Sequence, residues 1–350
     1  MEKLRVAVLG ATGYTGAELL RLLVGHPHVE ITEVVGHSKK GALLEDVLPA
    51  LRGHRGLPKH VSEFDPDRIA QKADCVFSCL PHGASGSCVA ELYRRGRVVL
   101  DLSGDFRLKD PLLHSKWYGH DPDPEVRQVA VYGLPELFRE KIRMARVVAL
   151  PGCYPTASIL PIAPLLEDGL IEANPIIIDA KSGVSGAGRE PNARTHYPEV
   201  SEGLRAYKVA GEHRHIPEIE AVLSQLTRTP VQLCFTPHLV PMNRGILASI
   251  YVRPKEGVTV EKICQSVKRR YAESPFVEVL APGACPDTLW IRGTNRVLLS
   301  YTIDERSGWL VCQSAIDNLV KGAGGQAIQC MNCIYGYGEG EGLEFLSAWP

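Results

Sequence analysis

The stretch LRVAVLGATGYTGAELLRLLVG, residues 4–25, holds a strand pattern, a glycine-rich turn and a helix pattern in that order. The apolar run at 4–10 predicts a buried strand, and 17–25 predicts an amphipathic helix that ends at Gly25. Glycines in such a turn let the backbone approach a pyrophosphate that faces the helix N-terminus. These glycines are Gly10, Gly13 and Gly16. The stretch therefore predicts a dinucleotide-binding turn that opens a Rossmann-type domain.

The residues after the second strand favour NADP(H) as the cofactor. This strand is predicted at 29–36 and is followed by a turn with no Asp or Glu to bind a ribose 2′-hydroxyl. A hydroxyl and ammonium groups suit a 2′-phosphate instead, so Ser38 and Lys39 are the predicted contacts and Lys40 is an alternative. The cofactor contacts predicted in the glycine turn are Gly10, Thr12, Gly13, Tyr14, Thr15 and Gly16.

Strands and helices alternate over the first 150 residues. Apolar strands separated by helices are typical of a parallel sheet covered on both faces. Besides the two strands above, the predicted elements are strands at 73–81, 96–104 and 146–150 and a helix at 85–95. The fold class expected for this half is therefore α/β, with a parallel sheet that binds NADP(H).

The pattern changes after residue 150 to long strands joined by short loops, which indicates a mostly antiparallel sheet. Strands are predicted at 174–183, 231–240, 246–254, 287–293, 296–304 and 308–316, and a helix at 260–274. A last helical stretch, 315–336, is expected to return to the first domain. We therefore predict an NADP-binding domain at 1–150 and 316–350, and an α+β catalytic and oligomerisation domain at 151–315.

Composition excludes several classes of protein. The chain has 350 residues, 45% hydrophobic and 23% charged, with a formal net charge of −1, so no global field favours nucleic acid or an acidic membrane. Its apolar runs are too short to span a bilayer, and MEKLR leads directly into a strand without a signal-peptide pattern. We expect a cytoplasmic protein that binds a small molecule and neither nucleic acid nor membrane.

The ten cysteines are scattered through apolar segments, which predicts reduced thiols. Cys330 and Cys333 form one CxxC pair, but a structural zinc site usually needs a second pair, so no metal site is expected. Cys153 differs from the others. In PGCYPT (151–156) it stands between a predicted strand and a predicted helix, and a helix N-terminus favours the thiolate and supplies N–H donors to an oxyanion. Cys153 is therefore the predicted nucleophile.

The order and spacing of several motifs resemble the N-acetyl-γ-glutamyl-phosphate reductase family, in the aspartate-semialdehyde dehydrogenase-like superfamily. The motifs are GATGYTGAELLRLL (10–23), FSCLPHGAS (77–85), DLSGDFRL (101–108), VYGLPEL (131–137), PGCYPTA (151–157), SGVSGAGR (182–189), HRHIPEI (213–219), TPHLVPMNRGI (236–246) and DNLVKGAGGQA (317–327). The resemblance implies reductive dephosphorylation of N-acetyl-L-glutamyl 5-phosphate in arginine biosynthesis. In that reaction Cys153 forms a thioester, which NADPH reduces to the semialdehyde.

The acid/base group is predicted in HRHIPEI. His215 is preferred because imidazole transfers protons near neutral pH and because it matches the second His of the family pattern. His213, two residues earlier, is the alternative. Glu218 lies three positions after His215 on a predicted helix and is expected to orient the imidazole.

The substrate carries a phosphate and a carboxylate, which suit planar arginine donors. Arg107 and Arg189 are preferred for their family-like motifs, Arg214 and Arg244 are further candidates, and Tyr207 is a weaker polar one. Ser182 and Gly183 are predicted to contact phosphate or nicotinamide. The resemblance also implies that Asn318 contacts the nicotinamide, although a helix cap formed by Asp317 or Asn318 is an alternative.

Two other functions share many of these features. A reductase of an aminoadipyl or glutamyl phosphate linked to a carrier protein would need a wider, basic pocket for its carrier. A non-catalytic NADPH sensor would need the glycine turn but not Cys153, His215 and Glu218 together. The resemblance further implies that the second-domain sheet forms a homodimer or homotetramer.

Overall fold

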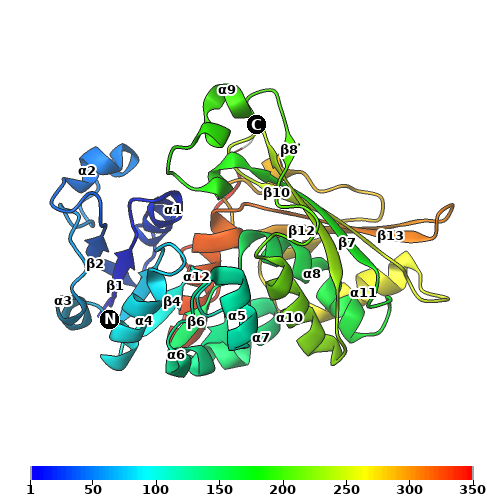
Figure 1. The fold of residues 1–350 in the computed structure, drawn as a ribbon, viewed down its shortest axis with the longest axis horizontal. Helices are drawn as coiled ribbons and strands as arrows, with labels where there is room; N and C mark the ends of the chain where they lie inside the picture. Colours follow the sequence, from blue (N-terminus) through cyan, green and yellow to red (C-terminus); the bar gives the residue numbers. More distant parts are fainter. Residues whose placement is uncertain (1, 349–350) are drawn as a thin grey trace. The chain divides into compact units, whose positions relative to one another are not determined.

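The computed structural model describes residues 2–348, which divide into two compact units. The first unit comprises residues up to Pro151 together with Ala323–Glu344, and the second comprises Gly152–Gly322 and the residues from Phe345. Figure 1 labels most of their elements. The chain returns to the first unit at Ala323 rather than at the expected residue 316, because residues 309–316 form the last strand of the second unit.

A six-stranded, wholly parallel sheet forms the centre of the first unit (Figure 1). Its order is β2-β1-β3-β4-β6-β5, and its strands are β1 (Leu4–Leu9), β2 (Val29–Val35), β3 (Cys75–Ser78), β4 (Val98–Asp101), β5 (Val131–Tyr132) and β6 (Val147–Ala149). The helices are α1 (Tyr14–Leu23), α2 (Leu44–Val47), α3 (Pro66–Lys72), α4 (Ser85–Arg94), α5 (Pro111–Tyr118), α6 (Pro124–Val129), α7 (Pro135–Arg143) and α12 (Gly325–Tyr335). This confirms the predicted α/β domain.

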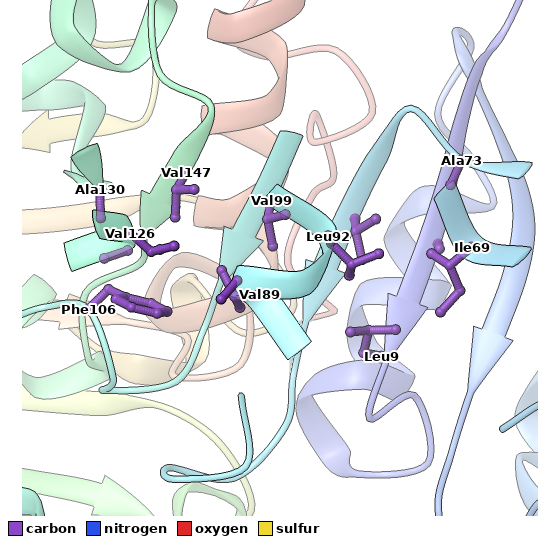
Figure 2. Packing of buried hydrophobic residues seen from close by; sticks show 14 of the residues in the cluster. Leu9, Ile69, Ala73, Val89, Leu92, Val99, Phe106, Val126, Ala130 and Val147 are labelled. Atoms are coloured by element: carbon purple, nitrogen blue, oxygen red, sulfur yellow. The ribbon is translucent and has the colours of Figure 1, made fainter. Parts of the chain in front are cut away.

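Figure 2 shows the hydrophobic core of this unit, where strand residues meet helix residues. Leu9 and Val99 of the sheet belong to the same cluster as Val89 and Leu92 of α4 and the fully enclosed Phe106. The central strands β1, β3, β4 and β6 are mostly apolar, because helices cover both sheet faces in such folds. This packing holds the carboxyl ends of the strands, where the glycine turn lies, in fixed positions.

The second unit contains a seven-stranded sheet of order β11-β12-β13-β10-β7-β9-β8. Its strands are β7 (Ile176–Gly183), β8 (Arg205–Ala206), β9 (Leu233–Val240), β10 (Ile246–Val252), β11 (Val277–Val279), β12 (Val297–Asp304) and β13 (Trp309–Ile316). Its helices are α8 (Cys153–Glu167), α9 (Tyr197–Val200), α10 (Ile216–Thr227) and α11 (Val260–Arg270). Only the β7–β9 and β11–β12 pairs are parallel, so the expected mostly antiparallel sheet is confirmed.

Two sequence-based element predictions are wrong. Residues 287–293 form a short 3₁₀ turn at Thr288–Trp290 instead of a strand, because Asp287 caps the N–H of Leu289 and Gly293 turns the chain at φ +77°. The single helix expected at 315–336 consists of the end of β13, a π-helical turn at Val320–Gly324 and α12. Both errors arise where local capping and backbone geometry override an apolar pattern.

Helix α8 carries two internal prolines, and side-chain hydroxyls replace the hydrogen bonds that these prolines remove. Pro161 cannot donate to the carbonyl of Ala157, four residues earlier, and Ser314 Oγ donates to that oxygen at 2.6 Å. Pro164 likewise cannot donate to the carbonyl of Leu160, and that oxygen accepts a 2.7 Å hydrogen bond from the Tyr271 hydroxyl instead. Ser314 of β13 and Tyr271, the C-cap of α11, thus hold the helix whose first residue is Cys153.

Within residues 2–348, every helix is too short or too polar to span a bilayer.

Candidate active site

Cys153 is the first residue of α8, as the sequence predicted. Gly152 is the N-cap, with extended backbone, and the first turn carries no acidic side chain. The positive end of the helix dipole therefore acts on the Cys153 thiol without a competing carboxylate in the same turn. Gly322 packs against this thiol residue, since a Cβ at position 322 would lie 2.8 Å from the Cβ of Cys153.

The N-terminus of α10 brings His215 and Glu218 to the residue before the cysteine. Glu218 Oε1 accepts a 2.8 Å hydrogen bond from the backbone N–H of Gly152, and Glu218 is almost fully buried. A side chain at position 152 would collide with Nε2 of His215, so the imidazole lies directly against the glycine backbone. The structure thus brings together the three predicted catalytic residues of the second unit, and it gives Glu218 a backbone contact that the sequence did not predict.

His213 is buried behind His215 and acts on it through the backbone. The Nδ1 atom of His213 accepts a 3.1 Å hydrogen bond from the N–H of His215, so Nδ1 carries no proton. Its ring packs edge-on against those of Tyr154, Tyr207 and Phe235. Burial, together with the charges of Lys208 and Arg214, lowers the pKa of His213 to about 3. A ring that stays neutral at physiological pH suits positioning better than proton transfer.

Two tyrosines extend the cluster. The hydroxyl of Tyr207 donates to that of Tyr154 at 3.3 Å, and Tyr154 donates to the carbonyl of His238 at 3.1 Å. Burial raises the pKa of Tyr207 to about 12, so its hydroxyl stays protonated and can donate. Tyr154 was not among the predicted site residues, although its place directly after Cys153 was a signal for it.

Ser182 and Gly183 end β7, and Asn318 forms hydrogen bonds with the loops next to that strand end. Asn318 Oδ1 accepts from the N–H of Gly245 at 2.8 Å, and its Nδ2 donates to Ser185 Oγ at 3.0 Å. Gly183 has no room for a side chain, because a Cβ there would lie 2.7 Å from the backbone of Asn243. Asn318 therefore positions the turn after β7, and its nicotinamide contact stays a prediction.

Asp317 is the capping residue of the following π-helical turn. Its fully buried carboxylate accepts from the N–H groups of Leu319 and Val320 at 2.8 and 3.1 Å. It also accepts from Arg244 Nη1 at 3.3 Å. Arg244, a candidate from the sequence, is thus oriented by a buried anion, which fixes its donor plane.

The other arginine candidates lie in different settings. Arg107, in the first unit, donates to the carbonyls of Leu150 and Leu102 at 2.7 and 2.9 Å and so anchors the end of β6. Arg214, between the two histidines, is half-buried, whereas Arg189 is exposed on the loop after β7. Their substrate contacts stay predictions.

The glycine turn of the first unit has the close backbone packing that a pyrophosphate site requires. Gly10 has φ +69°, and a Cβ there would lie 2.5 Å from the carbonyl oxygen of Cys79. A Cβ on Gly16 would lie equally close to the carbonyl oxygen of Gly10. Within residues 2–348 no side chain caps the N-terminus of α1 after Gly13, which leaves that helix end suited to an anion.

Ser38 and Lys39 are exposed in the turn after β2. Lys40 pairs with Glu63 at 3.3 Å, whereas no ion pair in the described part of the chain involves Lys39. Lys39 is therefore better placed than Lys40 to bind an added phosphate.

Comparisons with known proteins match this arrangement over both units. A family model described as "Semialdehyde dehydrogenase, NAD binding domain" matches residues 5–145, and one described as "Semialdehyde dehydrogenase, dimerisation domain" matches residues 153–318. N-acetyl-gamma-glutamyl-phosphate reductases of Pelobacter propionicus and Geotalea daltonii are each 47% identical over 347 residues, covering 99% of this chain and 100% of their own. The chain belongs to the N-acetyl-gamma-glutamyl-phosphate reductase family.

Solved structures of other enzymes share the fold of this chain. Aspartate semialdehyde dehydrogenase II of Vibrio cholerae, complexed with ASA, superposes with a TM-score of 0.72 at 16% identity, over 96% of this chain and 99% of that one. The Candida albicans enzyme with NADP gives 0.70 at 18% identity, over 95% and 99%. At this identity the likeness establishes the shared fold alone. It agrees with the two-unit architecture expected for the reductase family.

Proposed function

We propose that this protein catalyses the NADPH-dependent reductive dephosphorylation of N-acetyl-L-glutamyl 5-phosphate to N-acetyl-L-glutamate 5-semialdehyde and phosphate. The observation that carries the proposal is the placement of Cys153 at the start of α8, where the side chains of His215 and Glu218 contact the backbone of Gly152. The names of relatives at 47% identity support the choice of substrate.

The chemistry proceeds through a covalent acyl-enzyme. The Cys153 thiolate attacks the γ-carbonyl carbon, the carbon–oxygen bond to phosphate breaks, and a thioester with phosphate as leaving group results. Bound NADPH supplies a hydride to the thioester carbon. The carbon–sulfur bond then breaks, and the semialdehyde and the Cys153 sulfur are released.

His215 handles the proton in these steps. It takes the thiol proton before attack and donates that proton to the oxygen of the adduct formed after hydride transfer. It takes the proton back as the carbon–sulfur bond breaks and the carbonyl forms, and returns it to the sulfur. His213 holds the His215 backbone through its Nδ1, and Glu218 holds the turn that carries Cys153. Both are positioning residues in this scheme.

Cationic side chains bind the substrate anions. Arg244, oriented by Asp317, and Arg214, next to His215, supply donors for carboxylate and phosphate. Tyr207 supplies a neutral hydroxyl, and Arg107 and Arg189 are further contacts. In the first unit, the glycine turn would hold the pyrophosphate of the cofactor, and Ser38 and Lys39 would hold its 2′-phosphate. In the second unit, Ser182, Gly183 and Asn318 are the residues proposed to contact the nicotinamide.

We propose that the protein works in the cytoplasm as a homodimer or homotetramer assembled through the second unit. Several side chains on one face of this sheet are half-buried; they include Ile177, Tyr251 and Val311. Light scattering of the purified chain and of a Tyr251→Asp variant tests this, because a charge on a shared face should dissociate the oligomer.

Kinetics of the reverse reaction test the proposed activity. The wild-type chain should reduce NADP⁺ with N-acetylglutamate semialdehyde and phosphate, and Cys153→Ser should bind NADPH normally but give no turnover. Carrier-linked and one-carbon-longer semialdehydes should react poorly. Preference for a carrier-linked substrate would replace the proposed substrate, and turnover by Cys153→Ser would overturn the nucleophile. Binding of NADPH with no activity on any of the three substrates would instead support a sensor.

A further inference from the structure

A cluster of two histidines and one aspartate lies in the first unit, outside the proposed active-site residues. Asp105 follows β4, His114 lies on α5, and His120 comes directly after Gly119, whose φ of +75° ends that helix. One ligand atom from each residue lies within 4.8 Å of the other two. Nε2 of His120 is 3.2 Å from Oδ1 of Asp105.

Backbone carbonyls determine the tautomer of both histidines. Nδ1 of His114 lies 3.0 Å from the carbonyl oxygen of His120, and Nδ1 of His120 lies 3.0 Å from that of Tyr118. A carbonyl oxygen only accepts, so each Nδ1 carries a hydrogen and each neutral ring has its lone pair on Nε2. Metal-binding histidines commonly have this arrangement, in which the second nitrogen donates to a carbonyl and orients the ring.

The Nε2 atom of His114 is the unexplained group in this cluster. His114 is fully enclosed, and its Nε2 has no hydrogen-bond partner among the described residues. A buried polar atom without a partner is costly, and native structures contain few of them. The Nε2 lone pair of His114 accepts no proton from the described residues, and such a lone pair can bind a cation.

Backbone N–H groups orient the carboxylate of Asp105. Its fully buried carboxylate accepts from the N–H of Gly83 at 3.0 Å and from that of Gly86 at 2.8 Å. These bonds hold the oxygens in place without supplying a positive charge. They also connect Asp105 to the N-terminus of α4, which follows the PHGAS loop (81–85).

We propose that Asp105, His114 and His120 bind one divalent transition-metal ion of the zinc class. Two imidazoles and a carboxylate are a common ligand set for zinc, and ligands about 2.0–2.2 Å from the ion stand roughly 3.4 Å apart on a tetrahedron. The 3.2 Å separation of His120 and Asp105 fits this spacing, and the ligand atom of His114 lies within 4.8 Å of both. Water completes the fourth position, from a cavity of about 390 Å³ lined in part by Gly83, Asp121 and His120.

The ion would connect α5, the turn that ends it and the start of α4. The sequence predicts no metal site because its cysteines lack paired spacing. The present ligands are instead spaced Asp-x8-His-x5-His, and only the left-handed turn at Gly119 brings the second histidine back to the first. Metal binding would therefore stabilise the first unit rather than take part in acyl transfer.

Cobalt(II) and zinc(II) titrations of the full chain test the proposal. The Cys153→Ser background removes the proposed nucleophile as a competing ligand. We expect one Co²⁺ per chain at micromolar affinity, with visible absorption bands of a nitrogen- and oxygen-ligated ion and no thiolate charge-transfer band. Zn²⁺ should raise the melting temperature.

Variants locate the bound ion. His120→Asn, on a half-buried residue, and His114→Asn should each weaken Co²⁺ binding at least tenfold and abolish the thermal shift, whereas the exposed His54→Asn should change neither. Circular dichroism checks that each variant is folded. Unchanged binding in His120→Asn, thiolate bands in the spectrum, or no binding below millimolar concentration would overturn the site. The last result would leave a plain Asp105–His120 ion pair.

Discussion

Glu218 accepts a 2.8 Å hydrogen bond from the backbone N–H of Gly152, the residue before the proposed nucleophile. The carboxylate comes from the first turn of α10, and the N–H belongs to the N-cap of α8. This buried hydrogen bond therefore joins the helix that presents His215 to the helix that presents Cys153. The position of the His215 imidazole relative to the Cys153 thiol depends on this hydrogen bond.

Removing the Glu218 acceptor should weaken the connection between α8 and α10 and lower both stability and kcat. Glu218→Ala leaves the buried N–H of Gly152 unsatisfied, which costs about 1–3 kcal/mol of unfolding free energy, and kcat should fall more than tenfold. Glu218→Gln keeps an oxygen at the same place and should preserve most of the stability. Urea unfolding and steady-state kinetics measure the two effects. Equal stability of the Ala and Gln variants would contradict the role assigned to this bond.

A methyl group at position 152 should displace the imidazole. In Gly152→Ala the new Cβ collides with Nε2 of His215, and a shift of about 1 Å in an acid/base group can cost about 100-fold in kcat. NADPH binding should be unchanged, which fluorescence titration checks. Gly203→Ala is the matched control, because a Cβ at position 203 would have no neighbour within 4 Å and the variant should retain full activity.

His213 should make the protein less stable in acid. Its pKa is about 3 in the folded chain and about 6.5 when unfolded, so the unfolded state binds more protons between these values. Stability therefore falls as the pH drops below about 6.5, by about 2 kcal/mol at pH 5.

Replacing His213 with Asn should remove this part of the pH dependence, which urea unfolding at pH 5 and pH 7 measures. His196→Asn, on an exposed residue, should leave the dependence as in the wild type. His215→Asn should lower kcat far more than His213→Asn, and the reverse order would move the acid/base role to His213.

The Ser314 hydroxyl, which donates to a carbonyl of α8, should contribute more to the free energy of unfolding than a buried hydroxyl without a partner. Ser314→Ala leaves the carbonyl of Ala157 unpaired next to Pro161, at a cost of about 1–3 kcal/mol. Ser158→Ala is the control on the same helix. Its buried hydroxyl has no partner among the described residues, so its loss should be neutral or stabilising. Chemical denaturation of both variants compares them directly.

Lys39 should determine the preference for NADPH over NADH. Lys39→Gln removes a charge-assisted bond to the 2′-phosphate, worth about 10- to 100-fold in kcat/KM for NADPH, and should leave kcat/KM for NADH unchanged. Lys40→Gln should change the NADPH preference by less than about twofold, because Lys40 pairs with Glu63 at the surface. A larger effect in Lys40→Gln would exchange the two assignments.

Much of the fold was predictable because its signals are local. The apolar run of β1, the helix pattern of α1 and the glycines between them occupy a few consecutive turns of chain, where periodicity and backbone freedom decide the structure. The start of α8 at Cys153 followed in the same way from PGCYPT. The strand predicted at 287–293 is wrong because another local signal, the capping by Asp287, outweighs a weak apolar run.

The sequence by itself thus determined the dinucleotide turn, the alternation of strands and helices in the first unit, and the position of Cys153 at a helix start. Only the tertiary structure placed Glu218 on Gly152, enclosed His213, and paired Ser314 with Ala157. These contacts join residues 66 and 157 positions apart in the first and last cases. Hydrogen bonds at such separations depend on how helices and sheet pack, and no local pattern of residues encodes that packing.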